Sequence, residues 1–81
     1  MWHEGSIMIP VGKKETVICR YWVKAYDEPS GYGINEGKIS KLTIQINGKI
    51  TAEYDRGWEI EPDENDTPTQ IAYCILLHDY N

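Results

Sequence analysis

"ETVICRYWVKAY", residues 15–26, alternates in the way that a β-strand with two different faces requires. Because successive side chains of a strand point to opposite sides, the odd-numbered positions share one face. These positions are Val17, Cys19, Tyr21, Val23 and Ala25. The even-numbered positions are Ile18, Arg20, Trp22, Lys24 and Tyr26. The first face is expected to enter the core, whereas the second mixes aromatic rings with cations and is expected to meet a ligand or partner.

Three further strands are predicted around this one, at residues 2–9, 38–46 and 49–55. Asn47-Gly48 separates the last two and is typical of a two-residue hairpin turn. That turn would place the apolar residues of the two strands on opposite faces. A three-residue loop that also includes Ile46 pairs Ile44 with Ile50 instead and keeps the apolar residues together. We therefore expect the three-residue loop with a bulge.

"TPTQ", residues 67–70, indicates the start of a helix that spans residues 68–80. Thr67 is expected as the N-cap, with Pro68 at the first helical position and Gln70 completing a capping box. The helix contains "IAYCILL" at residues 71–77, which is apolar nearly all round and needs cover on two sides. The sheet can supply one side and a second protomer the other.

The expected fold class is therefore α+β, with one domain over residues 1–81. It consists of a four-stranded antiparallel meander sheet followed by one C-terminal helix packed on the sheet. Trp58 and Ile60 can add a short piece at the edge of the sheet before Pro62 ends it.

Composition excludes several classes of protein. The net charge is −5, and residues 53–81 carry Arg56 alone against eight acidic residues. This balance does not suit a protein that follows an extended nucleic-acid backbone. No apolar run is long enough to span a membrane. With two cysteines there is no disulfide framework, so we expect a cytoplasmic protein whose Cys19 and Cys74 are both buried.

"GYGINEGKIS", residues 31–40, contains a Gly-Lys pair that invites comparison with a phosphate-binding loop. A P-loop requires glycine at position 32 and a hydroxyl residue at position 39, where this chain has Tyr32 and Ile39. The segment remains a long hairpin connection with Tyr32 as a candidate binding residue. No metal-ligand spacing and no activated nucleophile is recognisable, so we expect no cofactor, no metal and no enzymatic activity.

Rings and cations converge on the second face of residues 15–26 and the loops beside it. Rings that stack and cations that neutralise phosphate suit a nucleotide or another planar anion. The candidate ligand-binding residues are Arg20, Trp22, Lys24, Tyr32, Lys38, Lys41, Arg56 and Trp58. Two alternatives stay open: an exposed sheet face on which long side chains cover the rings, and an interface with another subunit or partner.

"YWVKAYDEPSGYGINEGKISKLTI" at residues 21–44, "YDRGWEIEP" at residues 54–62 and "LLHDYN" at the end of the chain resemble a known family. It consists of small proteins of about 80 residues from bacteria and their phages, catalogued as a domain of unknown function. The resemblance implies no catalytic residues. It implies a phage accessory factor that blunts host immunity.

Two functions follow as hypotheses. The first is a non-enzymatic, anti-defence protein that sequesters a nucleotide or cyclic nucleotide as a homo-oligomer. The second is an inhibitor or adaptor whose acidic segment, residues 59–66, docks on a basic surface of a host protein.

Overall fold

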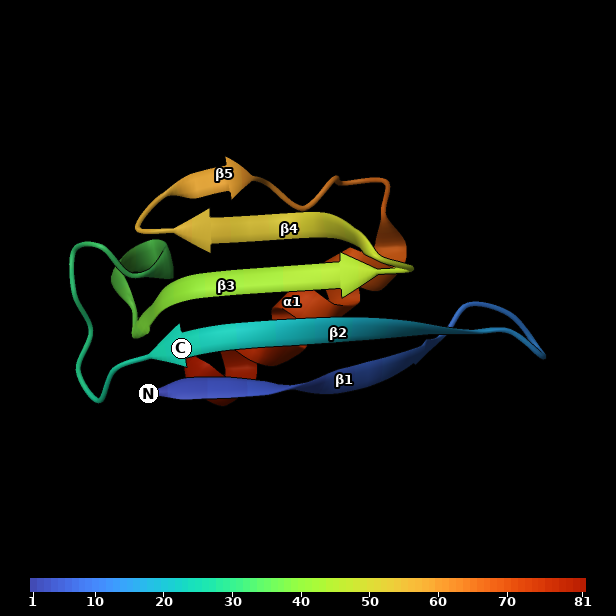
Figure 1. Ribbon diagram of the computed structural model, residues 1–81, viewed down its shortest axis with the longest axis horizontal. Coiled ribbons are helices and arrows are strands. Elements are labelled where there is room, and N and C mark those ends of the chain that lie inside the picture. The colour runs from blue at the N-terminus through green and yellow to red at the C-terminus, as the bar shows by residue number, and fades with distance from the viewer.

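One antiparallel sheet carries a single helix on one of its faces in the computed structural model of the protein, which describes residues 1–81 (Figure 1). The elements are β1 (Trp2–Pro10), β2 (Thr16–Ala25), a 3-10 turn η1 (Ile34–Glu36), β3 (Ile39–Ile46), β4 (Lys49–Asp55), β5 (Trp58–Ile60) and α1 (Thr67–Tyr80). The strands lie in the order β1-β2-β3-β4-β5. The α+β class with a C-terminal helix is thus confirmed.

The sheet has five strands, so the predicted number of four was wrong. The fifth strand is β5, which pairs with β4 through Tyr54 opposite Trp58. A tight turn at Arg56, with φ of 60°, reverses the chain between them. Its closing hydrogen bond runs from the Asp55 backbone N–H to the Gly57 carbonyl, at 2.8 Å.

The core lies between the sheet and α1, as the alternation in residues 15–26 predicts. Cys19 and Val23 on the odd-numbered face of β2 are fully buried. β3 and β4 supply further apolar residues to this face, and α1 closes it with Ala72 and Leu76. In Figure 1 the helix lies behind β1, β2 and β3, and no other element covers the opposite face. We call that opposite side the open face.

The β3–β4 hairpin turns through Asn47 and Gly48 alone, with φ of 52° and 78°. The expected three-residue loop was therefore wrong, because Ile46 pairs directly with Lys49. Ala52 and Tyr54 still share the core face with Ile44 and Leu42, since a bulge at Thr51 shifts the register one step further inside the hairpin. Ile44 consequently lies opposite Ala52. Ile50 lies opposite Gln45 and stays outside the core, so the expected pairing of Ile44 with Ile50 was wrong.

The helix begins one residue earlier than expected, and its N-cap is Asp66 rather than Thr67. The Asp66 carboxylate accepts the Thr69 backbone N–H at 3.2 Å. It also accepts the Thr69 hydroxyl at 2.7 Å, and that buried hydroxyl lies 2.8 Å from the hydroxyl of Thr51. The side chain of Gln70 donates to the carbonyls of Pro62 and Asp63 instead of completing a capping box.

The outer side of α1 is apolar and exposed, which matches the expectation of a helix that the sheet covers on one side. Ile71 and Ile75 keep 41% and 37% of their surface. Cys74 lies with them and is exposed, so the prediction of a buried thiol is correct for Cys19 and wrong for Cys74. No helix of the structure has the length and apolar character needed to cross a membrane.

Replacing Asp66 should measurably destabilise the fold. Asp66→Ala removes the N-cap and the acceptor of the buried Thr69 hydroxyl, so we expect the free energy of unfolding to fall by about 1–2 kcal/mol. Urea denaturation followed by circular dichroism measures this. Glu64→Ala, which removes an equal charge from the same segment without a side-chain hydrogen bond, should change stability by less than about 0.5 kcal/mol. Equal losses in both variants would contradict the assignment.

Candidate functional site

The long connection between β2 and β3 is held against one end of the sheet by three side-chain hydrogen bonds. The Tyr54 hydroxyl donates to the Tyr32 carbonyl at 2.8 Å. The side-chain amide of Asn81, at the end of α1, accepts the Ile39 backbone N–H at 2.9 Å and donates to the Ile34 carbonyl at 3.0 Å. A connection without a strand or long helix of its own therefore has a defined shape.

Two glycines of this connection, Gly33 and Gly37, serve close packing. A Cβ atom on Gly33 would lie 1.9 Å from the carbonyl oxygen of Gly37, and one on Gly37 would lie 2.3 Å from the side chain of Asn81. Between them, Asn35 and Glu36 adopt φ of 52° and 59°. The segment is thus a compact turn, in agreement with the failed P-loop comparison.

A pocket of about 250 Å³ opens where this connection meets the open face of the sheet. We call it the cationic pocket. It is lined by Lys24, Tyr26, Ser30, Tyr32, Ser40, Lys41 and Arg56. Its three cations come from β2, β3 and the β4–β5 turn, so residues distant in sequence assemble it.

The cations are only partly compensated by acids. Lys24 lies directly opposite Lys41 in the pairing of β2 with β3. The ion pairs of the structure are Lys41 with Asp55, at 3.8 Å, and His78 with Asp79. Lys24 and Arg56 consequently have no carboxylate partner. Like charges on directly opposed strand positions destabilise a sheet, so an anion bound between them would relieve a cost.

Two tyrosine rings stand beside these cations. The Lys24 ammonium lies 5.4 Å from the ring centre of Tyr26, and the Arg56 guanidinium lies 5.9 Å from that of Tyr32. A hydrogen bond from Lys24, and then its positive charge, lower the pKa of the exposed Tyr26 hydroxyl below its ordinary value, and the charge of Arg56 adds to this effect. Both cations therefore act on the Tyr26 hydroxyl.

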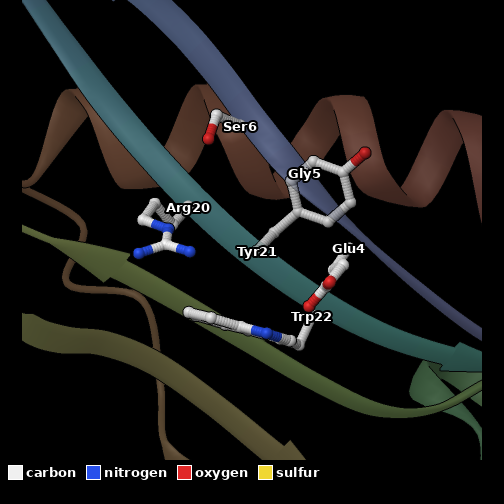
Figure 2. A pocket seen from close by; sticks show the side chains of 6 residues that line it. All are labelled: Glu4, Gly5, Ser6, Arg20, Tyr21 and Trp22. Atoms are coloured by element: carbon white, nitrogen blue, oxygen red, sulfur yellow. The ribbon is translucent and has the colours of Figure 1, made fainter.

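Four of the eight predicted residues lie together in the cationic pocket: Lys24, Tyr32, Lys41 and Arg56. Arg20 and Trp22 lie on the open face but line a second depression of about 200 Å³, which we call the edge hollow. Figure 2 shows the edge hollow, with Glu4, Gly5, Ser6, Arg20, Tyr21 and Trp22 around it. Its Arg20 guanidinium lies 5.3 Å from the ring centre of Trp22.

Two predicted residues do not join either group. Lys38 takes part through its backbone, because its carbonyl accepts the Tyr26 N–H at 3.0 Å. Trp58 packs on the helix side of the sheet, edge-on to Tyr54 and Tyr73 at centroid distances of 5.0 and 5.5 Å. Its ring belongs to the packing around the core, so the structure does not bring it into the cationic pocket with Arg56.

Three lining residues were missing from the predicted set. Tyr26 lies on the even-numbered face of residues 15–26, so the alternation alone could have included it. Ser40 lines the pocket because the register of β2 and β3 shifts between Lys24 and Ala25. Ser30 enters through the folded connection. Neither serine carries a local sequence signal that would have revealed this position.

No group of three or more His, Cys, Asp or Glu side chains comes together in a way that could hold a metal ion. The cationic pocket presents ammonium, guanidinium, phenol and hydroxyl groups. These groups donate hydrogen bonds and attract negative charge.

Fold and pocket together define a small α+β protein whose helix covers one face of the sheet and whose open face ends in a cation-lined depression. The chain belongs to the family described as Domain of unknown function (DUF7678), whose family model matches residues 1–81. The resemblance to a domain of unknown function is thereby confirmed. No curated protein and no solved structure matches the chain.

Replacing Lys24 should raise the pKa of Tyr26. Lys24→Met removes both the hydrogen bond and the nearest charge that stabilise the phenolate, so the phenol should titrate at higher pH than in the parent. An NMR titration that follows the tyrosine Cζ signals measures this. Arg20→Met, in the edge hollow, is the matched control and should leave Tyr26 unchanged. An unaltered Tyr26 titration in Lys24→Met would contradict the described contact.

Proposed function

We propose that the protein is a non-enzymatic binding protein that sequesters a nucleotide or cyclic nucleotide, with the ligand's phosphate in the cationic pocket. The observation that supports this most directly is the pair of opposed lysines, Lys24 and Lys41, with Arg56 beside them. An anionic phosphate would neutralise a cluster that the protein's own acids leave partly uncompensated.

The pocket's size favours a phosphate and adjoining atoms over a whole nucleotide. Its volume of about 250 Å³ lies below the range of about 300–1,000 Å³ that is typical of small-molecule sites. The base would then lie outside the depression, where the Tyr32 ring keeps 65% of its surface exposed and offers a face for stacking.

The hydroxyl groups of the pocket add a donor for phosphate oxygen. The Ser40 hydroxyl already donates to the Lys24 carbonyl at 3.3 Å. The Ser30 oxygen accepts the Tyr32 backbone N–H at 3.3 Å, which leaves the Ser30 hydroxyl proton available. Ser30 is thus the neutral donor that we propose beside the three cations.

The proposal includes a homo-oligomer and an anti-defence role. The exposed Ile71 and Ile75 and the small core both favour association with a second copy. A protein that sequesters its ligand acts by stoichiometry and needs no turnover. This suits a phage accessory factor that withdraws a nucleotide signal from host immunity.

A second proposal assigns function to the acidic segment at residues 59–66. Glu59, Glu61 and Glu64 are exposed and form no ion pair, so they could meet a basic surface of a host protein. The segment also stabilises the structure around it. Asp66 caps α1, and the Asp63 carboxylate accepts the Asn65 N–H at 2.8 Å. Binding of this kind would weaken strongly as salt is raised.

The pocket proposal predicts binding that depends on phosphate and on named cations. In calorimetric titrations the parent should bind adenosine monophosphate or a cyclic dinucleotide and should not bind adenosine. Arg56→Ala and Lys24→Met should each weaken binding about tenfold or more, since each removes a charge-assisted contact worth about 1.5–3 kcal/mol.

Lys13→Met is the matched control, because Lys13 is an exposed lysine in the β1–β2 turn at the other end of the sheet. It should bind like the parent. Folded Arg56→Ala and Lys24→Met variants that bind every probe as tightly as the parent would show that the ligand lies elsewhere.

A further inference from the structure

The outer edge of β1 is unpaired along nine residues. β1 is the first strand of the sheet and pairs only with β2. In Figure 1 no strand or loop runs beside its outer edge. A long free edge is a ready template for another strand.

The hydrogen bonds between β1 and β2 reveal which backbone groups of β1 are free. Met1 and Ala25 exchange both of their backbone hydrogen bonds, each at 3.0 Å, and Val11 donates to Glu15 in the same register. Such pairs recur at every second residue of an antiparallel ladder, so the odd-numbered residues of β1 bond to β2. The N–H and C=O groups of the even-numbered residues therefore point outward. Those with both groups are Trp2, Glu4, Ser6 and Met8.

The two edges of the sheet differ in how they are protected. β5, at the opposite edge, has three residues and is flanked by Glu61 and Pro62, features that discourage strand pairing. β1 has neither lysine nor, before its last residue, proline. It exposes 58% of Trp2 and 71% of Met8. The β1 edge is thus the one suited to association.

We propose that β1 pairs in antiparallel orientation with β1 of a second copy of this chain, joining two sheets into one continuous sheet. This places the interface of the proposed homo-oligomer at the β1 edge instead of at the exposed Ile71 and Ile75 of α1. It does not depend on whether the cationic pocket binds a ligand.

Self-pairing is favoured because one register gives every outward N–H group of β1 a partner. A two-fold axis perpendicular to the sheet leaves each side chain on its own face of the sheet. Because directly paired residues point to the same face, even-numbered residues of β1 must pair with even-numbered residues of the second copy. The axis therefore passes through one residue of β1. With Gly5 on the axis, Glu4 lies opposite Ser6 of the second copy. Trp2 then lies opposite Met8 of the second copy, and all four residues have an N–H to donate. About eight backbone hydrogen bonds result.

The neighbouring registers are worse for identifiable reasons. With Glu4 on the axis, two carboxylates face each other. With Ser6 on the axis, Trp2 faces Pro10 of the second copy, which has no N–H at a position that requires one. The register centred on Gly5 avoids both faults and buries the exposed side chains of Trp2 and Met8 against each other.

The dimer also places two edge hollows next to each other. Glu4, Gly5 and Ser6 line the edge hollow (Figure 2). In the proposed register Gly5 lies on the axis and the other two lie next to it. Each copy would bring its stacked Arg20 and Trp22 to the same side of the joined sheet. The open faces of the two copies would become one surface.

Oligomeric state without any ligand tests the proposal. Light scattering coupled to gel filtration should give the parent twice the 9.4 kDa mass of the chain. Ser6→Pro removes an outward N–H that β2 does not use, so the fold should persist and the mass should fall to that of one chain. Met8→Lys should have the same effect and serves if Ser6→Pro does not fold.

Ile75→Lys, on the exposed side of α1, is the matched control and should remain dimeric. A parent that is monomeric at high concentration would overturn the proposal. So would a dimer that survives Ser6→Pro and Met8→Lys but is lost in Ile75→Lys, because the helix would then be the interface.

Cysteine cross-linking tests the register. Glu4→Cys and Ser6→Cys are made separately in a Cys74→Ser background, which leaves only the buried Cys19. Under an added oxidant, the mixture of the two variants should cross-link faster than either variant alone. Faster linking in Ser6→Cys alone would place Ser6 on the axis and overturn the register.

Discussion

The side-chain amide of Asn81 is the contact on which the shape of the cationic pocket depends. It bridges the Ile34 carbonyl and the Ile39 N–H, and so fastens the β2–β3 connection to the end of α1. Without this contact, a connection of this length would sample many conformations. A ligand that bound it would then have to order the connection, and the lost conformational entropy would weaken binding. Together with the Tyr54 hydroxyl on the Tyr32 carbonyl, the amide presents Ser30 and Tyr32 to the lysines in a defined arrangement.

The net charge of −5 conceals a local cluster of cations. Lys24, Lys41 and Arg56 gather at the end where β2 stops and β3 begins. The acidic segment connects β5 to α1 and reaches the helix N-terminus at the opposite end of β3 and β4 (Figure 1). Lys41 is paired with Asp55 at 3.8 Å, whereas Lys24 and Arg56 form no ion pair. The hydrogen bond and charge of Lys24, and then the charge of Arg56, lower the pKa of Tyr26.

The sequence predicted those features that depend only on residues close together in the chain. The alternation of residues 15–26 identified the buried and the open face, and placed Lys24 on the open face. The sequence pattern did not predict features that depend on the pairing of residues distant in the chain. Trp58 turns to the helix side because of the tight turn at Arg56 and the register shift between Glu53 and Tyr54. The choice of Asp66 over Thr67 as N-cap depends on Thr51 and Thr69 meeting between strand and helix, which no local pattern encodes. Lys24 meets Lys41 only through the register of two strands joined by a long connection.

We propose that the cationic pocket holds a phosphate-bearing ligand. Native mass spectrometry of the purified protein, before and after incubation with a mixed pool of nucleotides and cyclic nucleotides, tests it most directly. We expect a discrete added mass that matches one phosphate-bearing component of the pool and is absent in Arg56→Ala. A protein that stays unliganded with every component, at low salt and with the fold intact, would contradict it.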